Sequence, residues 1–248
     1  MKRIDYPELH DGFFEEILPN GLRVRVLPRP GFARKFAFLA VDFGSNDRDF
    51  TLDGQKAHLP VIGRHNVANA LAAIAAAELI GVTQAQSIEA LATFKGIRRR
   101  LETVGTTKKG VTVIDDFGHN PEKIAASLSA LKEYAGRLIV IYQPHGFKPT
   151  KMMRAGIVEA FDKHLSMDDT LIMQEIYYAG GTASKDISSA DLVRDLEKTG
   201  KRVHFIPDRK KIVSLVKALA AKGDRVVIMG ARDESLGAFA KTILDSIG

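Results

Sequence analysis

The sequence predicts an α/β protein whose larger part is a doubly wound, mostly parallel sheet. Beyond about residue 105, short apolar segments alternate with segments that have helical patterning. Short apolar strands that alternate with helices are typical of a parallel sheet with helices on both faces. Polar residues follow four of the apolar segments, and ligands bind at that edge of such sheets.

Ten elements are expected in this part of the chain. The strands are expected at 111–115, 137–142, 170–174, 202–206 and 225–229. The helices are expected at 121–134, 151–164, 189–198, 210–221 and 235–247. This alternating order favours parallel strands that are joined by helical crossovers.

Residues 1–60 are expected to form a β-rich segment. Alternating apolar and charged residues predict a strand at 21–27, and an apolar run predicts another at 36–43. Turn signals lie at Pro19-Asn20-Gly21 and at Asp53-Gly54.

A pair of helices is expected next. The Ala-rich segment 66–80 predicts a helix that ends at Gly81, and Thr83 is placed to cap a second helix that runs to about Phe94. The chain thus divides into residues 1–60, residues 61–104 and an α/β domain at 105–248.

Composition narrows the class of protein. The 248 residues carry a net charge of +6, are 45% hydrophobic and contain no Cys, which excludes disulfides and Cys-based metal sites. The N-terminus lacks the apolar core of a signal peptide, and no apolar run is long enough to span a bilayer. We expect a cytoplasmic protein with no membrane partner. The spread of the basic residues favours no nucleic-acid partner.

The first candidate site lies at the start of the Ala-rich helix. His65, Asn66 and Asn69 fall within its first turns, and Asn66 and Asn69 are one turn apart, so their amides can face one point. Paired amides suit the donor and acceptor edge of adenine. The alternative is that Asn66 only caps the helix.

The second candidate is the run Arg98-Arg99-Arg100. Guanidinium groups bind phosphates and stack on bases, although such a run is more often a solvated face.

The third candidate is Asp115-Asp116, which follows a strand and precedes a helix opened by Pro121. A ribose hydroxyl or a metal would explain the acidic pair. The alternative is that Asn120 caps the helix and the Asp pair caps the turn.

The remaining candidates follow later strands. His145 and Lys148 could bind a carboxylate, although a lone His is more often structural. The segments Glu175-Ile176-Tyr177 and Gly230-Ala231-Arg232-Asp233 are weaker signals of the same kind.

Five segments, taken in order, resemble the Mur ligase family and its alanine-adding members in particular. They are GRHNVANALAAIAAAELIGV (63–82), FKGIRRRLETVG (94–105), VIDDFGHNPEKI (113–124), QPHGFKPTK (143–151) and EIYYAGG (175–181). The resemblance covers about residues 59–248. It implies that 61–104 are the end of a central ATPase domain with its linker, and that 105–248 are a Rossmann-like C-terminal domain.

The resemblance also implies a function in peptidoglycan precursor synthesis. Such ligases use ATP and Mg²⁺ to activate the carboxylate of a UDP-sugar, which an amino acid or peptide then attacks. By resemblance, nucleotide binding falls to His65, Asn66, Asn69, Arg100 and Asp116. Amino-acid binding falls to His119, His145, Lys148 and Tyr177.

Several departures from the family are visible. The alanine-adding members have His-His-Pro where this chain has His119-Asn120-Pro121, and Arg where it has Gly146 and Pro149. These departures weaken the case for L-alanine, and Lys148 is a possible substitute cation. The phosphate-binding pattern Gly-x-x-x-x-Gly-Lys-Ser/Thr is absent from the 248 residues, as are the UDP-sugar domain and the Mg²⁺-binding acid. We therefore expect no catalytic residues and little activity from this chain alone.

Residues 1–58 resemble instead the opening strands of pitrilysin-type zinc peptidases. The zinc motif His-x-x-Glu-His of that family is absent, so no metal site is expected. A gene fusion, a deletion scar or an assembled sequence would each explain the junction, as would a diverged Mur central domain.

Three hypotheses follow. The chain is a Mur-type ligase or the half of one that works with a partner chain carrying the ATPase loop. Alternatively, it is a non-catalytic module that binds nucleotide or amino acid. The third and weakest hypothesis is a protein related to zinc peptidases.

Overall fold

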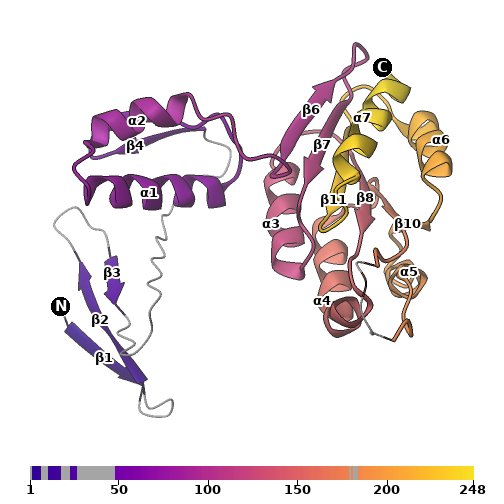
Figure 1. Ribbon diagram of the computed structural model, residues 1–248, viewed down its shortest axis with the longest axis horizontal. Helices are drawn as coiled ribbons and strands as arrows, with labels where there is room; N and C mark the ends of the chain where they lie inside the picture. The colour runs from indigo at the N-terminus through magenta and orange to yellow at the C-terminus, as the bar shows by residue number, and fades with distance from the viewer. Residues whose placement is uncertain (1, 7–10, 18–22, 27–47, 179, 181–183) are drawn as a thin grey trace.

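A computed structural model describes residues 2–6, 11–17, 23–26, 48–178, 180 and 184–248 of the protein. These residues form a small antiparallel sheet, a helical pair with a β-hairpin, and a C-terminal α/β domain (Figure 1). In the described part of the chain, no helix is long and apolar enough to cross a membrane.

The C-terminal domain is built on a six-stranded sheet with the order β10-β9-β8-β11-β7-β6. Its strands are β6 (Glu102–Thr106), β7 (Thr112–Asp116), β8 (Leu138–Gln143), β9 (Thr170–Met173), β10 (Arg202–Phe205) and β11 (Arg225–Gly230). All neighbouring pairs are parallel except β6 with β7. The predicted doubly wound, mostly parallel sheet is therefore confirmed.

Helices cover both faces of this sheet. They are α3 (Pro121–Lys132), α4 (Phe147–His164), α5 (Ser189–Glu197), α6 (Arg209–Leu219) and α7 (Leu236–Ile247). One hydrophobic core joins α3, α4 and α5 to the sheet, and a second joins α6 and α7 to its other face. The central strands β8 and β11 are buried along their whole length, as expected for strands between two helical layers.

In the C-terminal part of the chain, two elements differ clearly from the prediction. Helix α4 begins at Phe147 and not at 151. Pro149 is tolerated there because the first N–H groups of a helix have no acceptor within it. Strand β6 was not predicted, since its sequence Glu-Thr-Val-Gly-Thr has little apolar alternation and it forms by pairing with β7.

The helical pair consists of α1 (Arg64–Glu78) and α2 (Gln84–Ala92). As predicted, Thr83 caps α2, and its side chain accepts a hydrogen bond from the N–H of Gln86. A hairpin of β4 (Asp49–Leu52) and β5 (Gln55–His58) turns at Asp53-Gly54, as predicted. Both turn residues have positive φ, of 47° and 82°.

The N-terminal sheet contains β1 (Lys2–Tyr6), β2 (Asp11–Ile17) and β3 (Arg23–Val26) in an antiparallel order. The predicted strand at 21–27 is confirmed as β3. The predicted strand at 36–43 and the turn at Pro19-Asn20-Gly21 lie outside the described residues.

Candidate functional site

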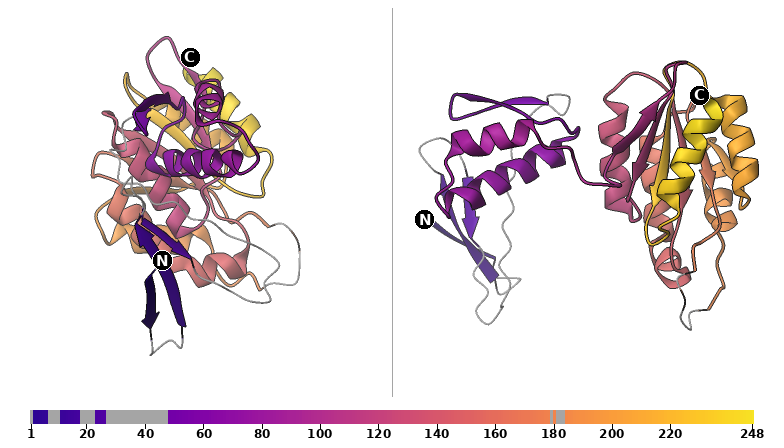
Figure 2. Two further views of the ribbon diagram at one scale, coloured as in Figure 1. Left: turned by 90° about the vertical axis from the view of Figure 1, so that its left-hand side faces the viewer. Right: turned by 45° about the horizontal axis from the view of Figure 1, so that its top comes forward.

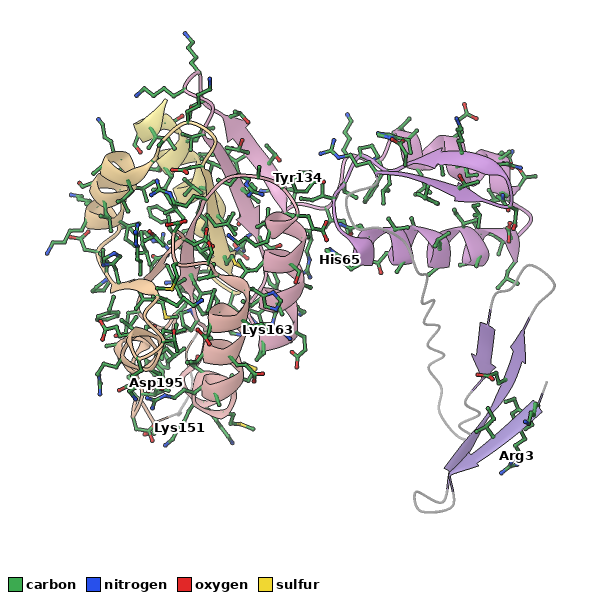
Figure 3. The ribbon with its side chains drawn as sticks, turned by 180° about the vertical axis from the view of Figure 1, so that it is seen from behind. Arg3, His65, Tyr134, Lys151, Lys163 and Asp195 are labelled. Carbon is green, nitrogen blue, oxygen red and sulfur yellow. The ribbon has the colours of Figure 1, made fainter. Side chains whose placement is uncertain are left out.

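A cavity of about 670 Å³ lies where the helical pair faces the C-terminal domain. Figure 2 shows α1 and α2 side by side next to the α3 edge of that domain, and Figure 3 shows His65 at the end of α1 that faces it. One wall comes from α1, the end of α2 and the linker, and the other from α3 and the loop after β7. All five residues predicted to bind nucleotide line this cavity: His65, Asn66, Asn69, Arg100 and Asp116.

The lining has an apolar part and a polar part. The apolar part is formed by Leu59, Val61, Ala70, Ala73, Leu91, Phe94 and Ile97. The polar part includes the two amides of α1 and two cations, Arg100 and Lys123. An apolar slot with a few convergent polar groups is the usual form of a small-molecule site. Its chemistry suits a flat heterocycle joined to an anionic group.

The amides of α1 are not helix caps. The helix begins at Arg64 after Gly63, with no side-chain cap, so the capping interpretation of Asn66 is wrong. Asn66 Nδ2 donates to the carbonyl of Ile62 at 2.7 Å, which holds the side chain in place. Asn69 is exposed to the cavity and makes no hydrogen bond with the residues that the structure describes. Its donor and acceptor are therefore available to a ligand.

His65 lies beside the N-terminus of α1. A Cβ on Gly63 would lie 2.7 Å from its Cε1, so the ring packs over the glycine backbone. Burial lowers the pKa of His65, and Arg100 lowers it further, while Asp116 opposes the shift. The imidazole is therefore mostly neutral at pH 7 and can both donate and accept hydrogen bonds.

Asp116 at the end of β7 is a structural clamp as well as a lining residue. Its Oδ1 accepts from the N–H of Leu101 at 3.0 Å, and its Oδ2 accepts from Gly118 N–H at 2.9 Å and from Ser127 Oγ at 2.8 Å. The side chain is almost completely buried. Asp116 thus joins the linker, the β7 loop and α3, as the turn-capping alternative predicts. Asn120 caps α3 through its contact with Lys123 N–H.

The three consecutive arginines have different environments. Arg99 places its guanidinium beside the Asp115 carboxylate at 3.3 Å and donates to the Gly230 carbonyl at 2.8 Å. Arg99 and Arg100 each lie 5.1 Å from the centroid of the Phe117 ring. Arg98 and Arg100 are both exposed, but Arg100 lines the cavity and Arg98 does not, so the solvated-face interpretation fits Arg98 best. Burial raises the pKa of Asp115, and Arg99 limits the rise.

His119 and His145 meet above the carboxyl edge of the sheet. Their ring centroids are 5.0 Å apart in an edge-to-face arrangement, and His119 Nδ1 lies 2.8 Å from the Phe117 carbonyl. Burial is the main cause that lowers the pKa of both imidazoles, and the charges of Lys123 and Arg232 lower it further. An anion placed here would meet two imidazoles and two cations.

Tyr177 and Lys148 are placed differently. The backbone N–H of Tyr177 donates to the Pro144 carbonyl, and its carbonyl accepts from Gly146, so the strand-like bridge fixes the His145 loop. Lys148 is exposed in the first turn of α4.

Sequence reasoning missed three residues that the fold brings to the site. Lys123 belongs to no motif that marks it as a binding residue. Arg99 was treated as one of three equivalent arginines, although among the described residues only it pairs with Asp115. Arg232 was noted within Gly230-Ala231-Arg232-Asp233 but was not selected. Among residues whose placement the structure describes, no group of three His, Asp or Glu gathers as a metal site.

Comparison with known proteins defines the class. The family described as Mur ligase, glutamate ligase domain, matches residues 99–232, slightly more than half of the chain. The chain belongs to the Mur ligase family. The predicted family resemblance is therefore confirmed for the C-terminal part, while the likeness of residues 1–58 to peptidases has no support.

Two relatives show which members of the family the chain is similar to. The chain is 40% identical over 174 residues to UDP-N-acetylmuramate–L-alanine ligase of Caldanaerobacter subterraneus, which covers 70% of this chain and 37% of that protein. The corresponding ligase of Paramagnetospirillum magneticum is 40% identical over 176 residues, with 70% and 36% covered. The chain thus spans little more than a third of the length of these relatives.

A solved structure of an alanine-adding ligase has a similar fold. The UDP-N-acetylmuramate–alanine ligase of Thermotoga maritima matches with a TM-score of 0.62 at 25% identity, over 77% of this chain and 39% of that one. An ADP complex of another ligase from the same organism matches in fold, with a TM-score of 0.57 at 18% identity, over 78% and 41%.

Proposed function

We propose that this chain is the nucleotide- and amine-binding part of a Mur-type, ATP-dependent ligase of peptidoglycan precursor synthesis. The observation that carries the proposal is the single cavity that gathers His65, Asn66, Asn69, Arg100 and Asp116 from three separate segments. The family assignment supports it, as do relatives named UDP-N-acetylmuramate–L-alanine ligase. The cytoplasm, where ATP is available, is the proposed location.

Each wall of the cavity has a part in the proposal. The apolar side chains of α1, α2 and the linker take the adenine ring, and the Asn69 amide reads its edge. The guanidinium of Arg100 and the ammonium of Lys123 bind phosphate oxygens. Asp116 holds the linker in position; its buried oxygens already accept three hydrogen bonds, which leaves it little capacity for ribose.

The amine substrate belongs at the carboxyl edge of the sheet. His119 and His145 present two imidazoles there, and Tyr177 fixes the loop of His145 through its backbone. ATP, when bound, supplies the phosphoryl group that activates the acceptor carboxylate. The proposal assigns the binding of transferring phosphate and Mg²⁺ to a segment or partner chain with a phosphate loop, because the 248 residues have no such pattern.

Calorimetric titration with ADP and ATP tests the nucleotide half of the proposal. The protein should bind both, and Asn69→Ala should weaken binding by about fivefold to tenfold, the worth of one or two hydrogen bonds. Glu78→Ala, in the last turn of the same helix, is the matched control and should bind as the wild type does. Absence of binding would contradict the proposal.

The second candidate function is a non-catalytic binding module, which the missing phosphate loop favours. Adding a protein that carries a Mur-type ATPase half discriminates between the two. Ligase turnover that requires both chains would support the split enzyme. Nucleotide binding without turnover in any combination would favour the module.

A further inference from the structure

Arg232 occupies the centre of the carboxyl edge of the sheet. The strand order places β11 between β8 and β7, so the loop after β11 lies between the loops that carry His145 and His119. Those two imidazoles are in contact across this position, with ring centroids 5.0 Å apart. The backbone of Arg232 therefore lies between the loops of the two imidazoles, close enough for its charge to act on both.

The backbone of Arg232 is in the left-handed region, with φ of 69°. A long side chain is strained there, where glycine would not be, and such strain is often retained at ligand sites. The side chain is exposed, and it forms no hydrogen bond or ion pair with any residue in the described ranges. Within the described part of the chain, no hydrogen bond or ion pair of Arg232 offsets this backbone strain.

Two buried acidic groups near Arg232 are already engaged, while Glu234 in the same loop is exposed. Asp233 accepts hydrogen bonds from Arg209 and Ser235, and Asp115 pairs with Arg99. The charge of Arg232 acts on the two imidazoles. Burial is the largest cause that lowers the pKa of His119 and His145, and the Arg232 charge lowers both values further. Among the described residues, the Arg232 guanidinium is thus unpaired, and a guanidinium can bind a carboxylate through two parallel hydrogen bonds.

The loop after β8 offers no equivalent group. Gly146 has φ of 71°, and a Cβ there would lie 3.2 Å from Pro149 Cδ, which makes a larger side chain unfavourable. We infer that Arg232 binds the carboxylate of the amine substrate and so selects substrates that carry one beside the imidazole pair. The inference rests on the proposed function and adds to it a binding residue from the loop after β11.

The test uses Arg232→Gly and Arg232→Lys in the full chain, with L-alanine as the probe and L-alaninamide as its analogue without a carboxylate. Binding is followed by nuclear magnetic resonance of the imidazoles of His119 and His145. The wild type should bind L-alanine more tightly than the amide. Arg232→Gly should weaken L-alanine by about tenfold or more, and Arg232→Lys by less.

Two further measurements separate this role from a structural one. Arg232→Gly should raise the pKa of both imidazoles, since a nearby positive charge is removed, while the melting temperature stays equal or rises because glycine relieves the strain. Asp53→Gly is the matched control: it removes a positive-φ side chain from the distant hairpin and should leave both imidazoles unchanged.

The outcomes distinguish this inference from the proposed function. Unchanged imidazole pKa values in Arg232→Gly, or equal binding of L-alanine and L-alaninamide by the wild type, would overturn the role of Arg232 while ADP binding still supported the ligase. Carboxylate binding that depends on Arg232, in a protein that does not bind ADP, would support Arg232 and contradict the nucleotide half.

Discussion

The carboxylate of Asp116 accepts a hydrogen bond at 3.0 Å from the backbone N–H of Leu101, and this contact fastens the linker to the end of β7. Leu101 has a positive φ of 47°, so the linker turns sharply at the point of attachment. The same carboxylate also holds Gly118 and Ser127. The geometry of the cavity between the two parts therefore depends on one buried side chain.

Replacing Asp116 with Asn should loosen this attachment. An Asn amide has only one acceptor oxygen. Where that oxygen accepts from the Gly118 N–H and the Ser127 hydroxyl, the NH₂ group faces the Leu101 N–H and cannot accept from it. Unsatisfied buried donors should lower the free energy of unfolding by about 1–3 kcal/mol. ADP affinity should fall as well, because the walls of the cavity lose their fixed spacing. Urea denaturation and calorimetry measure the two effects.

Ser127→Ala is the control for that variant. It removes one of the three donors to Asp116 and leaves the bond to Leu101 intact. Its effect on ADP affinity should be smaller than that of Asp116→Asn. Equal ADP affinity in the wild type and Asp116→Asn would show that the linker attachment does not shape the site.

The variant Arg99→Gln should make stability more sensitive to pH. Burial already raises the pKa of Asp115, and loss of the Arg99 charge should raise it further. A raised carboxyl pKa means that the folded state holds its proton more tightly than the unfolded state. The stability deficit of Arg99→Gln should therefore be large at neutral pH and shrink as pH falls toward the ordinary Asp range. A deficit that is constant with pH would contradict this account.

Two glycine variants isolate the contact at the start of α1. Gly63 and Gly81 both have positive φ, of 101° and 89°, so Ala is strained at either position by about 1–3 kcal/mol. Only at position 63 would the new Cβ collide, at 2.7 Å from His65 Cε1, whereas nothing lies within 4 Å at position 81. Gly63→Ala should weaken ADP binding and Gly81→Ala should not. Similar ADP affinities in both variants would remove His65 from the proposed site.

The two imidazoles at the carboxyl edge should make the stability of the protein sensitive to acid. Their pKa values are held below the ordinary value of 6.5, chiefly by burial, so protonation favours the unfolded chain. The free energy of unfolding should decline as pH falls below that value. Replacing His119 with Gln removes one of these groups, so this decline should be shallower in His119→Gln. Thermal unfolding over a pH series measures the slope, and an unchanged slope would contradict the assignment.

Much of the C-terminal fold was predictable because its signals are local. Apolar strands buried on both faces and the Pro121 helix start are each encoded by a few adjacent residues, as is the Thr83 cap in the helical pair. Strand β6 was not predictable, because it depends on pairing with β7 rather than on its own pattern. The early start of α4 was missed because Pro149 was not recognised as a first-turn residue.

In the candidate site too, residues in short motifs could be predicted, whereas their partners from distant segments could not. The amides and imidazoles were selected from short motifs, and the structure brings the nucleotide set to one cavity. The partners of these groups come from distant segments: Arg99 contacts Gly230, and Arg232 approaches His119 and His145 only because β11 inserts between β7 and β8. Such contacts follow from strand order, which no single segment encodes.

Photolabelling with 8-azido-ATP, followed by mass spectrometry of the labelled peptides, tests the central claim most directly. The azide lies on the adenine ring, so it should label the walls formed by residues 59–73 and 91–97, and excess ADP should prevent the labelling. The variant Asn69→Ala should be labelled less at the same positions. Labelling confined to other surfaces, or labelling that excess ADP leaves unchanged, would contradict the assignment of this cavity to the nucleotide.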